Sequence, residues 1–285
     1  MKPTFIGIGA QKCASTWIYD ILCDHPEAAL SREKEVNFFS FHYDHGFQWY
    51  LKHFPENPHA RAIGEVSPSY FHEPSVPERV KHFLPEAKII VSLREPISRA
   101  MSNHRHEVRI GHLSGEDLSF ESGLRNNPCY IEQGLYATHL TRWLQYFSRD
   151  KMLVLLVEDI VAEKRQVAKR IYEFLEIDAN HLSESLYTQS NPSYVNRYPW
   201  LEQFRETARH AVTRVGLGRL WDLARRGGLR ELYSRFNKMP SEIVIPPVSQ
   251  HTIRELRQRF EEEIASLEKI LDRPLTGWRC DNEAR

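Results

Sequence analysis

Residues 5–17 read FIGIGAQKCASTW, an apolar run followed by a short loop with one lysine and the start of an amphipathic segment. The pattern predicts a strand over residues 4–9, a tight loop, and then a helix. The first N–H groups of a helix have no partner inside the helix, and the helix dipole favours negative charge there. With Lys12 in the loop and hydroxyls at Ser15 and Thr16, this segment predicts a site for a phosphate or a sulfate.

The spacing of this loop differs from that of the loops that bind nucleoside triphosphates. In the pattern GxxxxGK[ST], the lysine follows a glycine directly and the next hydroxyl holds magnesium. Here Lys12 stands three residues before Ser15 and follows Gln11 rather than a glycine. The segment therefore indicates an anion site of a different kind.

A second predicted strand leads into a second candidate anion site. Residues 89–91 are Ile, Ile and Val, which is typical of a buried strand, and Arg94 stands at the carboxyl end of that strand. Pro96 suits the first turn of a helix, and Ser102 follows on this helix. Parallel sheets bind ligands beyond the carboxyl ends of their strands, so we expect Arg94 and Ser102 on the same edge as Lys12. The guanidinium fork of Arg94 matches a phosphate.

Strand-like and helix-like segments alternate along most of the chain. This alternation predicts an α/β fold with a P-loop-like parallel sheet that is flanked by helices on both faces. Apolar residues at helical spacing over residues 248–271 predict a helical C-terminal extension. Residues 109–133 are rich in Gly, Ser, Asn and Pro and are expected to form a loop-rich insertion. The predicted strands are 4–9, 61–65, 88–93 and 152–157, and the other predicted helices are 15–23, 46–53, 76–83, 96–108, 134–147 and 161–175.

Composition limits the partners and the location of the protein. The 285 residues carry 38 Lys plus Arg and 38 Asp plus Glu, whereas binding to nucleic acid needs a basic surplus. No apolar run is long enough for a bilayer and no export signal is evident, so the sequence predicts a cytoplasmic protein. The cysteines and histidines lack the spacing of a metal site, and we expect free thiols, with Cys13 made reactive by the helix start and Lys12. The cysteines are Cys13, Cys23, Cys129 and Cys280.

Residues 200–238 combine nine cationic side chains with interleaved leucine and aromatic residues. The pattern predicts a basic helical insertion over residues 200–245, within a single domain of residues 1–285. We expect its apolar stripe to pack on the core. The alternatives are a lid over an anionic or amphiphilic acceptor, or contact of residues 205–238 with the anionic inner surface of a membrane.

Several of these segments resemble the sulfotransferases that use 3′-phosphoadenosine 5′-phosphosulfate (PAPS). Residues 9–16, GAQKCAST, resemble the 5′-phosphosulfate loop of that family, and Ala14 stands where most members have glycine. An alanine is tolerated there in a near-helical backbone and is strained at positive φ. The resemblance implies that the loop binds the cofactor through Gln11, Lys12, Cys13, Ala14, Ser15 and Thr16, with Lys12 also acting in catalysis.

Further cofactor-binding residues follow from the same resemblance. Residues 93–102 resemble the family's LRxPxxRxxS motif, which implies that Arg94 and Ser102 hold the 3′-phosphate of PAPS. Trp17 matches the tryptophan that stacks on adenine in the steroid and phenol sulfotransferases, and the alternative is a tryptophan packed in the core. Arg197 falls where the family closes a loop over the nucleotide, and it would reach the 3′-phosphate.

A third motif points to a catalytic base. Residues 34–39, KEVNFF, resemble the KExxFF stretch of the heparan-sulfate-type and related bacterial sulfotransferases. The resemblance implies that Glu35 is the general base that removes the acceptor proton, with Phe38 and Phe39 excluding water from it. The alternative is that Glu35 only forms a surface ion pair with Lys34 or Arg32.

Two shorter matches support this branch of the family. Residues 46–50, GFQWY, and residues 65–71, EVSPSYF, resemble its GxxWY and ExxPxY stretches. Some heparan-type enzymes carry a second active-site lysine at the position of Val66. The second lysine is therefore absent here, and the resemblance does not imply an acceptor as anionic as heparan sulfate.

Together the motifs imply transfer of a sulfuryl group from PAPS to a hydroxyl or amine of a carbohydrate, lipid or natural-product acceptor, without a metal. A P-loop kinase or nucleotide triphosphatase is the first alternative, and it would bind ATP or GTP with magnesium. The second alternative is a non-catalytic protein that binds a nucleotide or a lipid surface. The position of Lys12 and the 3′-phosphate-like motif favour the sulfotransferase.

Overall fold

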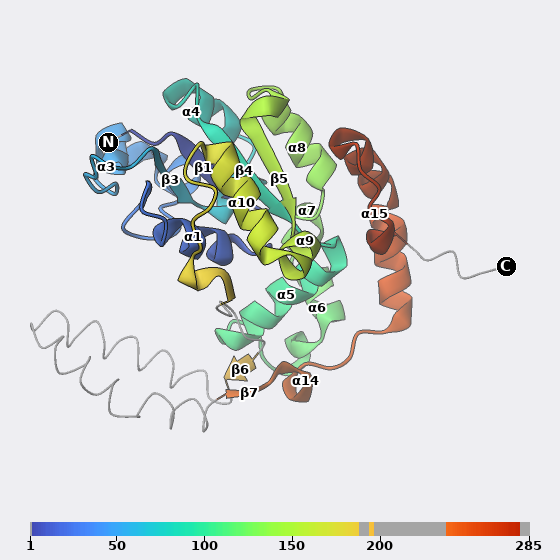
Figure 1. Cartoon of the computed structure of the whole chain (residues 1–285). Coiled ribbons are helices and arrows are strands. Elements are labelled where there is room, and N and C mark those ends of the chain that lie inside the picture. Colours follow the sequence, from blue (N-terminus) through green and yellow to red (C-terminus); the bar gives the residue numbers. More distant parts are fainter. Residues whose placement is uncertain (1, 188–193, 197–237, 280–285) are drawn as a thin grey trace, which may run out of the picture. The chain divides into compact units, whose positions relative to one another are not determined.

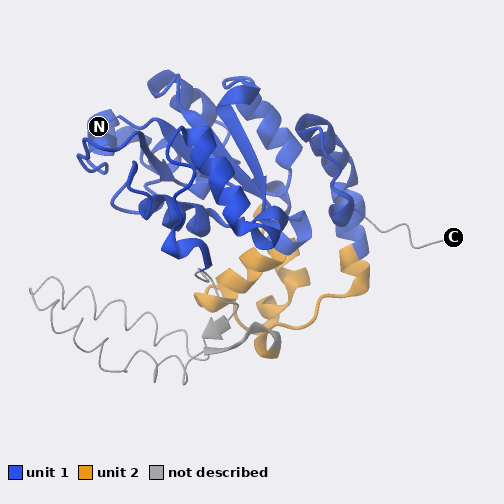
Figure 2. Cartoon of the chain, in the orientation of Figure 1, with its two compact units in different colours: residues 1–99, 131–190, 254–285 blue, residues 100–130, 191–253 orange. Residues whose placement is uncertain are grey.

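The structure is a computed structural model, and it describes residues 2–187, 194–196 and 238–279 (Figure 1). The chain divides into two compact units (Figure 2). The first unit comprises residues 1–99, 131–190 and 254–285, and the second comprises residues 100–130 and 191–253.

A five-stranded sheet forms the centre of the first unit, and all of its strands pair in parallel. The strand order is β2-β3-β1-β4-β5, so β1 lies in the middle. The four predicted strands are confirmed, whereas the three-residue β2 was too short to show a period in the sequence. The strands are β1 (Phe5–Gly9), β2 (Ala28–Leu30), β3 (Ala62–Val66), β4 (Lys88–Leu93) and β5 (Met152–Leu156).

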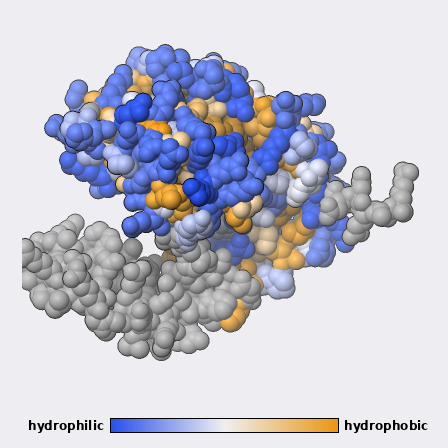
Figure 3. Space-filling view, viewed as in Figure 1, coloured by the Kyte–Doolittle hydropathy of each residue, from blue (hydrophilic) through white to orange (hydrophobic). Residues whose placement is uncertain are grey.

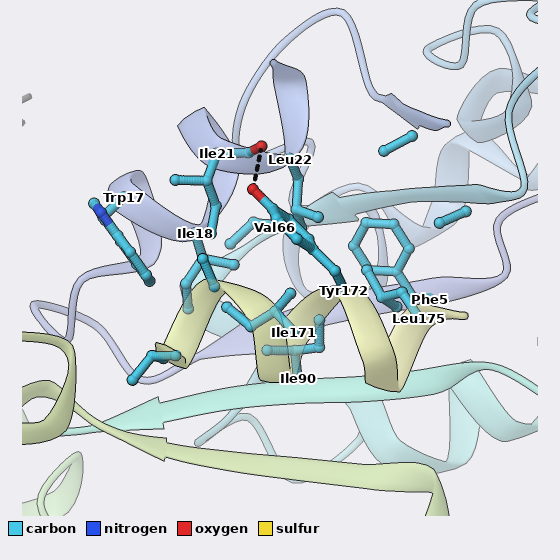
Figure 4. Packing of buried hydrophobic residues seen from close by; sticks show 14 of the residues in the cluster. Phe5, Trp17, Ile18, Ile21, Leu22, Val66, Ile90, Ile171, Tyr172 and Leu175 are labelled. Carbon is cyan, nitrogen blue, oxygen red and sulfur yellow. Dashed lines mark hydrogen bonds between the residues drawn. The ribbon is translucent and has the colours of Figure 1, made fainter. Parts of the chain in front are cut away.

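Both faces of this sheet are covered. Every residue of β1 and β3 is buried, and side chains alternate between the two faces of a strand. On one face, Phe5 and Ile90 share a cluster with α1 (Ser15–Cys23) and α10 (Lys164–Leu175) (Figure 4). Ile89, Val91 and Leu93 are buried outside this cluster and belong to the opposite face. The predicted parallel α/β fold is thereby confirmed.

The predicted helices of the first unit occur close to their expected positions. The expected helix over 161–175 is divided, because Glu163 leaves the helical conformation with φ −139° and ψ 57°. The predicted C-terminal extension is confirmed as α15 (Gln250–Leu271), which buries Leu256, Phe260 and Ile264. The other helices here are α2 (Phe38–Phe41), α3 (Phe47–Leu51), α4 (Val76–Phe83), α8 (Tyr136–Leu144) and α9 (Val157–Ala162), with 3₁₀ turns η1 (Tyr43–His45), η2 (Pro68–Tyr70), η4 (Arg149–Lys151), η5 (Glu184–Tyr187) and η6 (Thr276–Trp278).

The second unit corrects the expectation of a loop-rich insertion over residues 109–133. This segment contains η3 (Gly115–Leu118), α6 (Phe120–Asn126) and α7 (Cys129–Glu132). The hydroxyl of Ser119 accepts the Ser122 N–H at 3.3 Å and so caps α6, while buried Phe120 stacks on Tyr130. The Ser119 cap and the buried ring of Phe120 stabilise this helix, although its Gly and Asn content had favoured a loop.

One further helix, a strand pair and a short helix belong wholly or partly to the second unit. Helix α5 (Pro96–Arg109) begins in the first unit and continues into the second. Strands β6 (Tyr194–Asn196) and β7 (Lys238–Pro240) pair antiparallel, and α14 (Ser241–Val244) follows. Most of the predicted basic insertion of residues 200–245 lies outside the described residues. None of the helices in the described ranges is long and apolar enough to cross a bilayer, and in Figure 3 much of the described surface is hydrophilic.

Candidate active site

Three neighbouring strands bring predicted site residues to one edge of the sheet. Strand β1 pairs with β3 on one side and with β4 on the other. The loop with Lys12 follows β1, and Arg94 follows β4. Glu35 is attached to the end of β3, because its N–H donates to the Val66 carbonyl at 3.2 Å. This carboxyl edge is where parallel α/β sheets bind ligands.

The loop after β1 has the backbone of an anion-binding loop. Lys12 and Ala14 have φ values of 66° and 64°, and Gly9 has a φ of 126°. Left-handed residues in such alternation turn successive N–H groups toward one point. A residue with a side chain does not fit at position 9, because a Cβ on Gly9 would lie 2.7 Å from the Pro68 carbonyl oxygen. Ala14 adopts the positive φ at which an alanine is strained.

Helix α1 presents an uncompensated amino end beside this loop. It begins at Ser15, its first internal hydrogen bond runs from the Ile18 N–H to the Ala14 carbonyl, and no side chain caps it. The N–H groups of the first turn therefore lack an intrahelical acceptor. The first turn contains no acidic residue, so the positive end of the helix dipole is not neutralised by its own side chains. Gln11, Lys12 and Thr16 are half-buried around it, and Ser15 is buried.

The turn after β4 keeps the Arg94 side chain available. The Arg94 guanidinium makes no hydrogen bond or ion pair with the residues that the structure describes. An ion pair with Glu95 is not formed, because the Glu95 carboxylate accepts the N–H groups of Ile97 at 2.9 Å and Ser98 at 2.6 Å. Glu95 thus caps α5 and leaves Arg94 to other anions.

Two acidic residues that follow β5 make structural contacts. The Glu158 carboxylate accepts the Glu95 N–H at 3.1 Å and the Trp278 indole N–H at 3.2 Å, which supports the turn after Arg94. Asp159 forms a two-pronged ion pair with Arg273, and these bonds lower the pKa of Asp159.

Glu35 forms the surface ion pair that the sequence analysis gave as the alternative to a catalytic role, and the catalytic role stays a prediction. Its carboxylate forms an ion pair with Lys34, and its side chain is 46% exposed. Its backbone has a φ of 64° and its carbonyl accepts the Asn37 side-chain amide at 2.9 Å, so the loop holds it at the sheet edge. Phe38 and Phe39 are fully buried and pack on Tyr50, and their shielding of Glu35 from water stays a prediction.

A buried carboxylate that had no assigned role supports the Glu35 loop. Glu65 is fully buried in β3 and accepts hydrogen bonds from the hydroxyls of Ser67 at 2.6 Å and Tyr70 at 2.8 Å. Burial raises the pKa of Glu65. The Ser67 hydroxyl in turn accepts the Asn37 N–H at 3.0 Å. The ExSxxY spacing was the sequence signal for this network.

Two residues of the predicted cofactor loop face the protein interior. Cys13 is completely buried, and burial raises its pKa to about 12, so the expected reactive thiol is wrong. Desolvation outweighs the helix end and the nearby cations. Trp17 is 5% exposed and its indole N–H donates to the Leu186 carbonyl at 3.1 Å. This placement corresponds to the core alternative for Trp17.

Two predicted cofactor-binding residues lie outside the first unit or outside the described residues. Ser102 lies in α5 within the second unit, and Arg197 lies outside the described residues. Cys13 and Cys23 are free thiols. Arg99 had no assigned role, although it is fully buried and donates to the Gln133 side-chain carbonyl at 3.0 Å. Its signal was the second arginine of the LRxPxxRxxS motif.

A separate cavity of about 780 Å³ lies between α9, α10 and η5. Leu186 contributes to its lining, whereas none of the predicted cofactor-binding residues within the described ranges does. The candidate site is therefore defined by the loop after β1 and the turn after β4. Within the described ranges, no group of three His, Cys, Asp or Glu side chains could hold a metal ion.

A parallel α/β sheet with a short anion-binding loop after its central strand defines a P-loop-like class of protein. A family model described as the sulfotransferase domain matches residues 2–221, and the chain belongs to this family. A solved sulfotransferase from Alicyclobacillus acidocaldarius shares the fold, with a TM-score of 0.70, 22% identity, and coverage of 98% of this chain and 99% of that one.

Curated relatives are similar over part of their length. Bifunctional heparan sulfate N-deacetylase/N-sulfotransferase 4 of Mus musculus is 30% identical over 209 residues, which cover 65% of this chain and 23% of the relative. Heparan sulfate glucosamine 3-O-sulfotransferase 6 of Mus musculus is 31% identical over 179 residues, which cover 61% of this chain and 52% of the relative. The chain thus spans about a quarter to a half of these proteins.

Proposed function

We propose that this protein transfers a sulfuryl group from PAPS to a hydroxyl or amine of an acceptor. The observation that carries the proposal is the loop of Lys12, whose left-handed backbone leads into an uncapped helix start at the sheet edge. The loop fits a phosphosulfate, because it offers backbone N–H groups, two hydroxyls and one ammonium, and the first helical turn contains no acidic side chain. Membership of the sulfotransferase domain family supports the same reaction.

Different residues hold the two ends of the nucleotide in this proposal. Residues 11–16 bind the 5′-phosphosulfate through backbone N–H groups, the Lys12 ammonium and the hydroxyls of Ser15 and Thr16. Arg94, with Ser102, holds the 3′-phosphate. The assignments of Ser102 and Arg197 rest on the family motif and on position in the chain. We assign Trp17 to the core rather than to adenine, since it is buried and its N–H is already bonded.

PAPS supplies the sulfuryl group when it is bound. The bond between sulfur and the bridging oxygen of the 5′-phosphate breaks with its electron pair on that oxygen, and a bond forms from sulfur to the acceptor oxygen or nitrogen. Glu35 takes the proton that the acceptor loses. Lys12 and the helix start neutralise the charge that develops on the departing phosphate. The protein therefore acts mainly by positioning groups and stabilising charge.

The acceptor we propose is a carbohydrate or another small molecule that is less anionic than heparan sulfate. The names of these relatives describe sulfation of heparan sulfate and of its glucosamine. Val66 argues against a highly anionic acceptor, because it is 2% exposed and packs on Gly7 of β1, so it adds no cation to the site. A cytoplasmic location and contact of residues 205–238 with an anionic membrane stay predictions, which fractionation and flotation on acidic vesicles can test.

Transfer of labelled sulfate tests the proposal. With ³⁵S-labelled PAPS and a panel of desulfated, N-deacetylated glycans and simple amino sugars, we expect label in the acceptor fraction. Glu35→Gln and Lys12→Ala should each lower the transfer rate at least about 100-fold, and Glu35→Gln should leave nucleotide affinity within about twofold. Glu33→Gln is the matched control, because Glu33 is an exposed acid of the same loop, and it should keep the wild-type rate. A Glu35→Gln enzyme with wild-type turnover would remove Glu35 as the base.

A further inference from the structure

Two buried hydroxyls tie the loop of Lys12 to the strand that ends before Arg94. Ser92 is fully buried, and its hydroxyl donates to the Cys13 carbonyl and lies 3.4 Å from the Gly9 carbonyl. The Ala10 N–H donates to the Ser92 carbonyl at 2.7 Å. These bonds join β4 to the loop within the sheet itself.

The second hydroxyl comes from a different element. Tyr136 is the first residue of α8 and is 1% exposed. Its hydroxyl donates to the Arg94 carbonyl at 2.9 Å and lies 3.9 Å from the sulfur of Cys13, which is itself fully buried. One side chain thus contacts both the cofactor loop and the turn of Arg94, and it contacts them from the protein side.

The consequence for a two-phosphate ligand is geometric. A second phosphate adds affinity only when its binding group is already held at the spacing of the ligand. Cys13 is the neighbour of Lys12 in the chain, and the Arg94 carbonyl belongs to the same residue as the Arg94 guanidinium. A bond that fixes these segments to one hydroxyl therefore fixes the spacing of the two anion sites.

We propose that Tyr136 is a positioning residue that holds the Lys12 loop and the Arg94 turn at the spacing of a nucleotide bisphosphate. The inference rests on the proposed function, since the two anions are the 5′ and 3′ groups of one nucleotide. Tyr136 touches no substrate in this account. Its removal should weaken the cooperation between the two sites more than it weakens either site alone.

Calorimetric titration with two nucleotides tests this directly and needs no acceptor. The probes are 3′-phosphoadenosine 5′-phosphate and adenosine 5′-monophosphate. The Kd of the monophosphate divided by the Kd of the bisphosphate reports the contribution of the 3′-phosphate. In Tyr136→Phe we expect this ratio to fall roughly five- to tenfold, with the Kd of the monophosphate changed less than about twofold. Arg94→Ala gives the floor of the ratio.

Tyr172→Phe is the matched control, because it removes another buried tyrosine hydroxyl of the first unit, which donates to the Ile21 carbonyl at 3.3 Å (Figure 4). It should keep the wild-type ratio. If Tyr136→Phe does not fold, Cys13→Ala tests the same tie from the loop side, and the ratio should again fall. An unchanged ratio, or an equal loss for both nucleotides, overturns the inference. A wild-type protein that binds neither nucleotide overturns the proposed function instead.

Discussion

Among single residues, His139 makes the clearest pH-dependent contribution to stability. It is 6% exposed, its Nε2–H donates to the Glu132 carbonyl at 2.8 Å, and its Nδ1 accepts from Arg142 at 3.4 Å. Arginine only donates, so the ring is neutral. Burial lowers the pKa of His139 to about 4, and the Arg142, His72 and Arg99 charges act in the same direction.

This lowered pKa predicts a loss of stability in mild acid. The unfolded chain binds a proton near pH 6.5 that the folded protein accepts only near pH 4, so the free energy of unfolding falls as pH drops through this window. Between pH 7 and pH 5 the loss from this group is about 2 kcal/mol. His139→Gln keeps a donor for the Glu132 carbonyl and should reduce the pH dependence by that amount. Urea unfolding at both pH values measures the free energy of unfolding. The same decrease between pH 7 and pH 5 in the wild type and in His139→Gln would contradict the prediction.

Residue identities at the site were easier to predict than residue surroundings. Lys12 and Arg94 were predicted from their spacing relative to strands and helix starts, which is visible in the sequence, whereas Glu35 was predicted from the family resemblance. The directions of Cys13 and Trp17 were not visible, since a loop with left-handed residues has no period from which a side chain's face can be read. Glu65 was missed for a related reason, because an acid in a strand is normally expected at the surface.

At the level of elements, the junction of the β1 loop and α1 stores backbone strain at Ala14. An L-residue in the left-handed region costs about 1–2 kcal/mol. Glycine avoids this strain, but it loses more conformational entropy on folding, which offsets part of the gain. Ala14→Gly should therefore raise the free energy of unfolding by about 0.5–1 kcal/mol in urea.

The matched control for this substitution is Ala168→Gly, in the buried interior of α10. There the backbone is helical, so glycine should destabilise the protein by about 1 kcal/mol. If both variants lose stability to the same extent, the left-handed conformation of Ala14 is not the source of strain at this junction.

The elements with a strong period were predicted well, and the short ones were not. The β-branched run of β4 and the apolar face of α15 carry enough residues to show their period. Strand β2 has three residues, and α6 depends on the Ser119 cap and on tertiary burial of Phe120. Such contacts between distant residues have no signature in local composition.

For the whole molecule, strand order is what makes the site. Lys12, Arg94 and Glu35 come from segments that are far separated in the sequence, and they reach one edge because β3, β1 and β4 are neighbours in a parallel sheet. The alternation of strands and helices predicted a parallel sheet, whereas the order β2-β3-β1-β4-β5 required the structure. The fold-level match to a solved bacterial sulfotransferase agrees with this arrangement.

The most direct test of the account is the thermal unfolding of the whole chain with 3′-phosphoadenosine 5′-phosphate, compared with ATP plus magnesium. A ligand that binds only the folded state stabilises it by about 2.7 kcal/mol at a hundredfold excess over its Kd. We predict a clear rise in Tm with the bisphosphate alone, and a much smaller rise in Arg94→Ala. A rise only with ATP plus magnesium would contradict the account and favour a kinase or nucleotide triphosphatase.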